Sequence, residues 1–123
     1  MITVNKIELK HTTELMNSSD YRERFVAEYL QTKIRYEKLK TFNTHIRAAE
    51  VSPNVNEPKH DCPYYVLEGQ QNLMGQYLHH LEIRAVIEGI DLETSLQKLI
   101  QKVNYESGCD KTCCEMVPLT GKC

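Results

Sequence analysis

Arg84 is the charged residue whose sequence position most strongly suggests a binding role. It lies in the stretch GQQNLMGQYLHHLEIRAV, residues 69–86, beside Leu81 and Ala85 on one face of an expected helix. At such a position the guanidinium can bury its stem against apolar neighbours, but its charge still needs a partner. Two interpretations follow: a structural salt bridge, or a ring of arginines from several chains that closes on a phosphate ligand.

A second group of cations lies between residues 20 and 49. Seven basic residues face four acidic ones there: Arg22, Arg24, Lys33, Arg35, Lys38, Lys40 and Arg47 against Asp20, Glu23, Glu28 and Glu37. This pattern is typical of a solvated helix face with ion pairs between near neighbours. It also fits an anion-binding surface, in which Arg22 and Arg24 hold phosphates and Tyr21 stacks on a base.

Metal-binding and catalytic patterns are weak in this sequence. Four cysteines fall in the last fifteen residues, Cys109, Cys113, Cys114 and Cys123. Two of them are adjacent, which is poor spacing for a zinc site, so incidental thiols, zinc and disulfides all stay open. His79 and His80 are neighbours that diverge on a helix and fit a surface or an interface, and Cys62 is expected in the core. We predict no catalytic residue, no metal and no cofactor.

The hydrophobic pattern predicts a single, mainly all-α domain. An amphipathic helix is expected from Tyr21 to about Ala49, capped by Asp20 with Glu23 completing a capping box. A loop with two prolines follows, and Asp61 with Pro63 suits the start of a second helix. The apolar spacing of that helix fits an antiparallel neighbour, through Leu67, Gln71, Met74, Leu78, Leu81 and Ala85.

The remaining segments divide the chain into four parts. Residues 1–19 are expected to form an N-terminal arm, with a short strand over residues 2–9 as the alternative. Residues 20–90 form the helical hairpin, and residues 91–108 a third, shorter helix that Asp91 caps and Gly108 ends. Residues 109–123 are a cysteine-rich tail without periodicity.

Composition excludes several function classes. The chain has 123 residues and a net charge of −2, which argues against a protein that coats nucleic acid. No signal peptide or membrane-spanning run is recognisable, so a soluble, intracellular protein is expected. The two long helices carry more apolar and aromatic surface than they can hide from each other. Some of it must be covered by the third helix or by another copy of the chain, and we therefore expect a homo-oligomer.

Two stretches, ERFVAEYLQTKIRYEKLKTF and YVLEGQQNLMGQYLHHLEIRAV, resemble the helical hairpin of phage anti-defence sponge proteins. That family includes proteins that counter the Thoeris and CBASS systems, and hairpin proteins named after a crAss-like phage. The resemblance covers roughly residues 20–90. The motif residues are Glu37, Lys38, Leu39, Gln70, Met74, Tyr77 and Arg84.

The resemblance implies a non-catalytic oligomer in the host cytoplasm, often a hexamer, that sequesters cyclic oligonucleotide or cyclic ADP-ribose signals without cleaving them. It also implies that Arg84 gathers around a threefold axis and grips phosphates. Two positions differ from the family pattern: Val26 stands where dinucleotide binders have a lysine, and Ile83 where the trinucleotide binder has a hydroxyl.

A different class of function remains open. The chain fits a helical adaptor or inhibitor that blocks another protein and binds no small molecule. Arg84 separates the two hypotheses, because a sponge needs it free to face an axis or a pocket, whereas an adaptor ties it to Glu82, Glu88 or another carboxylate. An enzyme that cleaves the signal is disfavoured, because no general base accompanies a nucleophile or metal.

Overall fold

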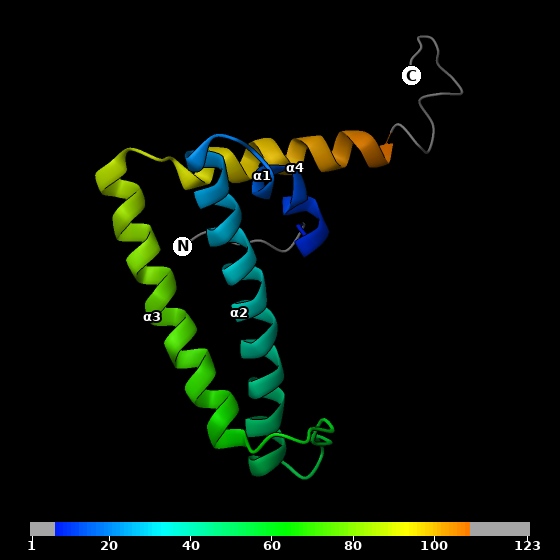
Figure 1. Cartoon of the computed structure of the whole chain (residues 1–123). Coiled ribbons are helices and arrows are strands. Elements are labelled where there is room, and N and C mark those ends of the chain that lie inside the picture. The colour runs from blue at the N-terminus through cyan, green and yellow to red at the C-terminus, as the bar shows by residue number, and fades with distance from the viewer. Residues whose placement is uncertain (1–6, 109–123) are drawn as a thin grey trace.

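The computed structural model describes residues 7–108, and over this range the protein is all-α. A short 3₁₀ helix and a one-turn helix precede three longer helices, as Figure 1 shows. Their bounds are η1 Leu9–Thr12, α1 Thr13–Met16, α2 Tyr21–Val51, α3 Tyr64–Glu88 and α4 Leu92–Gly108. The mainly all-α prediction is confirmed.

The N-terminal segment differs from the predicted strand. Residues 2–6 lie outside the described range, and Leu9 begins η1 instead of ending a strand. The 3₁₀ turn is closed by Glu8 and His11, because the His11 Nδ1 accepts a hydrogen bond from the Glu8 N–H at 2.9 Å. Local hydrogen bonding of this kind competes with strand formation, so the segment folds back as a helical cover on α2.

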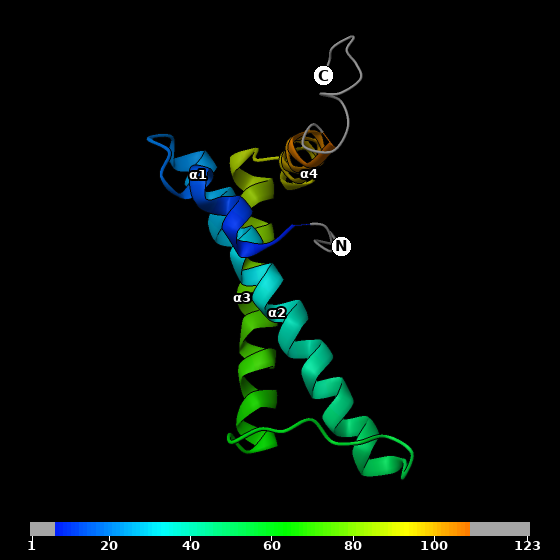
Figure 2. The ribbon, with the colours of Figure 1, turned by 90° about the vertical axis from the view of Figure 1, so that its right-hand side faces the viewer.

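Helices α2 and α3 form the expected antiparallel hairpin, and they cross at an angle in the two views of Figures 1 and 2. Leu78, Leu81 and Ala85 are buried in the contact with α2. Toward the loop the contact becomes polar: the Asn43 Nδ2 donates to the Leu67 carbonyl at 3.2 Å and to Gln71 Oε1 at 2.9 Å. The predicted seam is confirmed by burial along one face of α3: Leu78, Leu81 and Ala85 are buried, and the other three seam residues are half-buried.

Helix caps explain where α2 and α4 begin. The Asp20 Oδ1 accepts the Arg22 N–H at 2.9 Å, and the Asp91 Oδ1 accepts the Thr94 N–H at 3.0 Å. Thr94 also donates from its hydroxyl to Asp91 Oδ2 at 2.8 Å, and these bonds hold the pKa of Asp91 below its usual value. Both caps were predicted from the sequence, but the capping box with Glu23 was wrong, because the Asp20 N–H donates to Ser18 Oγ at 3.0 Å.

Gly89 makes the sharp turn that releases α4 from the hairpin. Its φ is 73°, a left-handed conformation that favours glycine. The Ile90 N–H donates a hydrogen bond to the Ala85 carbonyl at 2.9 Å, which caps the C-terminal end of α3. As a result α4 runs across the end of the hairpin in Figure 1.

The hydrophobic core lies at that same end of the molecule. Tyr29 and Leu30 of α2 are fully buried, Leu96 of α4 is 1% exposed, and Ile7 covers them from the N-terminal side. Part of the apolar surface that the hairpin cannot hide is therefore covered by α4, as one of the sequence interpretations expected.

Several predictions concern residues outside this core. The cysteine-rich tail, with Cys109, Cys113, Cys114 and Cys123, lies outside the described residues. Cys62 is only partly buried in the loop between α2 and α3, so its predicted core position is wrong. No helix within residues 7–108 has the length and apolar character to cross a membrane.

Candidate functional site

Arg84 lies on a surface formed jointly by the start of α2 and the end of α3. Its guanidinium stacks over the ring of Phe25, with the central carbon 4.8 Å from the ring centre. Its Nε and Nη2 each lie 3.1 Å from Glu88 Oε2, one helical turn further along α3. The side chain is 51% exposed, so its charge keeps contact with water. Phe25 and Glu88 together fix the plane of the guanidinium.

Two more predicted residues converge on the same end of α3. The Tyr21 hydroxyl donates to Glu88 Oε1. The Arg22 guanidinium donates to the Glu88 carbonyl at 2.8 Å and to the Gly89 carbonyl at 3.5 Å. Arg22 thereby satisfies carbonyls that the end of a helix leaves without partners. The structure thus brings Tyr21, Arg22 and Arg84 together around Glu88.

Arg24 does not join this group. Its Nη1 donates to the Ser18 carbonyl at 2.8 Å, in the turn that precedes α2. The guanidinium therefore holds that turn against the first residues of α2, which is a structural role.

We call Tyr21, Phe25, Arg84 and Glu88 the Arg84 cluster. Within it, the pKa of Glu88 is lowered, first by the hydrogen bond from Tyr21 and then by Arg84. The pKa of Tyr21 is raised, chiefly because its hydroxyl donates to that carboxylate. At neutral pH the cluster therefore contains an ionised carboxylate, a protonated phenol and a guanidinium.

Another tyrosine extends this surface toward the middle of the hairpin. Tyr77 precedes Arg84 by two helical turns, and its hydroxyl donates to Glu28 Oε2 on α2. Tyr77 is 45% exposed and Tyr21 46%, so both rings stay accessible. The surface thus combines two accessible aromatic rings and a guanidinium with two carboxylates, a set suited to binding a polar ligand with flat rings.

Sequence reasoning missed Phe25 and Glu28 as parts of this surface, and considered Glu88 only as an alternative partner of Arg84. A signal was present in the spacing. Phe25 follows Tyr21 by one turn and Glu88 follows Arg84 by one turn, so antiparallel packing of the two predicted helices places these pairs opposite each other.

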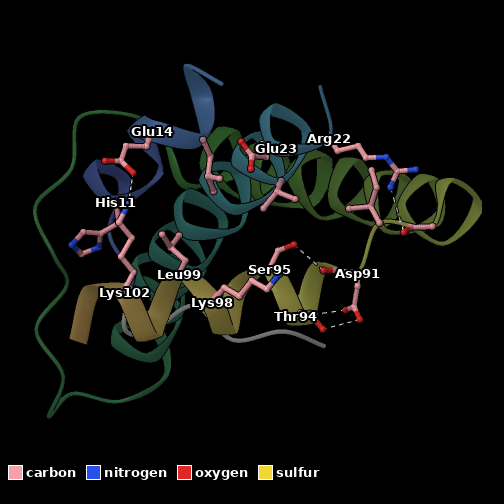
Figure 3. Close-up of a pocket in the computed structure, with 14 residues that line it drawn as sticks. His11, Glu14, Arg22, Glu23, Asp91, Thr94, Ser95, Lys98, Leu99 and Lys102 are labelled. Carbon is pink, nitrogen blue, oxygen red and sulfur yellow. Dashed lines mark hydrogen bonds and ion pairs between the residues drawn. The ribbon is translucent and has the colours of Figure 1, made fainter. Parts of the chain in front are cut away.

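A cleft of about 450 Å³ opens on the other side of Arg22, between the N-terminal segment, the start of α2 and α4 (Figure 3). Its floor is apolar and includes Val26 and Ile90. Glu23 of α2 and Lys98 of α4 lie on opposite walls, and an ion pair between Lys102 and Glu14 connects α4 to α1. Its rim carries both signs of charge, which gives the cleft no clear preference for an anion.

Metal chemistry has no visible site in the part of the chain that the structure describes, because no group of three His, Cys, Asp or Glu side chains there could hold an ion. His79 and His80 are exposed, and His79 Nδ1 lies 3.9 Å from Glu82 Oε1. Both histidines thus lie on the surface, as the sequence suggested.

The comparison with protein families gives one match. A family model described as Sequestin matches residues 19–87. This range covers α2, the connecting loop and nearly all of α3, and it includes Tyr21, Arg22, Arg24 and Arg84. No curated protein and no solved structure matches the chain.

Proposed function

The chain belongs to the Sequestin family, and from this premise we propose that it is a phage anti-defence protein that binds and sequesters a cyclic nucleotide or cyclic ADP-ribose signal of bacterial immunity. The signal is held without being cleaved, in the host cytoplasm, and the name of the family suggests capture of a ligand or a partner. The observation that carries the proposal is the stacking of Arg84 on Phe25 beside the accessible rings of Tyr21 and Tyr77.

Arg84 keeps donors for an anion although it is paired with Glu88. A guanidinium has five N–H groups, and Glu88 Oε2 accepts the Nε–H and lies 3.1 Å from Nη2. Both N–H groups of Nη1 remain for an anion. Because Phe25 and Glu88 already fix the side chain, a phosphate that binds there costs little side-chain entropy.

The two carboxylates favour a nucleotide over a simple phosphate. Glu28 and Glu88 repel a bare anion, but they accept hydrogen bonds from sugar hydroxyls and from base amino groups. A ligand with phosphates, sugars and flat bases can therefore satisfy Arg84, the carboxylates and the tyrosine rings together. A cyclic ligand is preorganised, which adds to its affinity.

One observation favours a second candidate, a helical adaptor that blocks another protein. Arg84 is tied to Glu88, which is the arrangement expected of an adaptor and not of an arginine that faces an empty axis. The Arg84 side chain is 51% exposed and that of Glu88 27%, so water still screens the pair and a phosphate can compete with it.

Calorimetric titration against a panel of cyclic dinucleotides, cyclic trinucleotides and cyclic ADP-ribose isomers tests the sponge proposal. We expect tight binding to one class of ligand and recovery of the intact ligand after heating. Arg84→Ala should weaken binding about 10- to 100-fold, the loss of a charge-assisted hydrogen-bonding group.

Arg47→Ala is the matched control, because Arg47 pairs with Glu50 at the far end of α2 and should not affect affinity. If correctly folded protein gives no heat with any ligand of the panel, the sponge proposal fails and the adaptor is favoured. If the ligand is recovered cleaved, sequestration without cleavage is wrong.

A further inference from the structure

Helix α3 carries a second stripe of residues beside the one that packs on α2. We call it the outer stripe, and its members are separated alternately by four and three residues: Val66, Gln70, Leu73, Tyr77, His80 and Arg84. This is the spacing with which a helix packs along a helical neighbour. Within residues 7–108, α2 is the one element that packs extensively on α3, and the side of α3 away from α2 is open in Figure 1. The outer stripe flanks the α2 contact: Tyr77 and Arg84 reach Glu28 and Phe25 of α2, but both keep an exposed side.

The outer stripe is apolar enough to be costly in water. Leu73 is 67% exposed, and Val66 and Tyr77 are each 45% exposed. Moreover, residues 69–81 contain no Asp, Glu, Lys or Arg, a run of more than three helical turns. The solvent face of a helix normally carries charges, as the outer face of α2 does here.

Gly69 gives an independent indication that something approaches α3 closely. A glycine inside a helix costs about 1 kcal/mol relative to alanine. A Cβ at Gly69 would meet no atom within 4 Å, so nothing in the described part of the chain requires the missing side chain. Close approach of another helix would require it.

We propose that the outer stripe binds the same stripe of a second copy of this chain, with the two α3 helices antiparallel. The stripe has heptad spacing and carries no formal charge from Val66 to His80, so over this length it is complementary to itself: neither charge repulsion nor a mismatch in spacing opposes the contact. In the register that aligns the two stripes, Leu73 faces Tyr77 of the second copy and Gln70 faces its His80.

Charge decides the orientation. The stripe has its one formal charge, Arg84, at its C-terminal end. Parallel helices would place two guanidiniums side by side, whereas antiparallel helices separate them by about 27 Å along the axis. Each Arg84 then lies beside the other copy's uncharged Val66 end.

This contact also bears on the ligand site, a consequence that rests on the proposed function. Tyr65 is 75% exposed next to Val66, so the second copy would bring an aromatic ring toward Arg84. Leu73 of the second copy would cover part of Tyr77, so the rings left for the ligand in the pair would be Tyr21 of one chain and Tyr65 of the other. If several Arg84 side chains meet around a symmetry axis, the chains must touch there through a surface other than this α3–α3 contact.

Sedimentation equilibrium of the full chain without ligand tests the contact. We expect a dimer or a multiple of it. Leu73→Glu should raise the dissociation constant of the pair at least about tenfold, because it buries a charge in the interface. Val86→Glu is the control, because Val86 is 82% exposed on the same helix but lies off the stripe. A wild-type chain that stays monomeric at all concentrations, or equal effects of the two folded variants, would overturn the proposal.

A charge-pair experiment tests the orientation and does not depend on Leu73. In the antiparallel contact, Gln70→Glu with His80→Lys in one chain creates two attractive pairs between copies, and it should tighten association. Gln70→Lys with His80→Lys should weaken it. In a parallel contact both double variants place like charges together. Weaker association of the chain that carries Gln70→Glu with His80→Lys would therefore overturn the antiparallel arrangement.

The two proposals fail separately. Association is measured without ligand, and ligand binding is measured by titration. A dimer that binds no nucleotide would support the α3 contact and contradict the sponge proposal. A monomer that binds nucleotide would support the sponge proposal and contradict the α3 contact.

Discussion

Two ion pairs on the hairpin have the same sequence spacing, but their cations lie in opposite environments. On α2, the Lys33 Nζ lies 3.0 Å from Glu37 Oε2, and the Lys33 side chain is fully buried. On α3, Arg84 lies 3.1 Å from Glu88, but its side chain is 51% exposed. Both pairs join residues four apart on a helix, so the difference comes from what packs around them.

The environment assigns the two pairs different roles. A buried ammonium has lost its hydration, and it depends on Glu37 and on the Tyr36 ring 5.6 Å away for compensation. It cannot exchange partners without a large cost. Arg84 keeps water, spare donors and an exchangeable carboxylate, which are the properties that a binding residue needs.

The largest effect is expected from breaking the buried pair. Glu37→Ala leaves the Lys33 ammonium buried without its carboxylate, and should lower the free energy of unfolding by about 3 kcal/mol. Lys33→Met added to that variant removes the buried charge and should recover most of the loss, because methionine can replace the aliphatic stem. Chemical denaturation of the three proteins measures both effects. Equal stability of wild type and Glu37→Ala would show that the ammonium is not dependent on its partner.

A much smaller effect on stability is expected from the exposed pair. Arg84→Ala should lower the free energy of unfolding by less than about 1 kcal/mol, because an exposed ion pair contributes little. The same variant is expected to lose much of its ligand affinity. This combination separates a binding residue from a structural one. If Arg84→Ala instead lowers the free energy of unfolding by about 3 kcal/mol in the same experiment, Arg84 is a structural cation, as Lys33 is.

The two ion pairs also show which features of the fold could be predicted from the sequence and which could not. The hairpin, the caps at Asp20 and Asp91 and the contact face of α3 follow from periodicity and local hydrogen bonding, and they were predictable. Lys33 was assigned to a solvated basic face because of its charge. Its spacing of three from Leu30 and seven from Val26 nevertheless places it on the buried side of α2.

The candidate site was only partly predictable for a related reason. Arg84 and Tyr21 could be selected from residue type, but Phe25 becomes a partner of Arg84 only when α2 and α3 are aligned. The N-terminal segment was left open between an arm and a strand, because a local 3₁₀ turn, closed between Glu8 and His11, cannot be recognised from apolar alternation. Tertiary alignment and side-chain hydrogen bonds decided each of these cases.

The smallest and most specific effect concerns the pKa of Glu88. The Tyr21 hydroxyl and Arg84 hold this pKa below the ordinary value of 4.5, with Tyr21 as the larger cause. A lowered carboxyl pKa contributes stability that is present above the ordinary value, and it is lost as the pH falls through the lowered pKa. Tyr21→Phe should therefore move the Glu88 pKa back toward 4.5, and the cluster should open at a higher pH than in the wild type.

Carbon-detected NMR titration of the Glu88 carboxyl measures this shift directly. Tyr64→Phe is the control, because the Tyr64 hydroxyl donates to Glu68, at 3.4 Å, at the opposite end of α3. If Tyr21→Phe leaves the Glu88 pKa unchanged while Arg84→Ala raises it, then Arg84 alone holds the carboxylate. Tyr21 would then be free to act as a stacking ring, and the contrast with the fully buried Lys33 side chain would be sharper still.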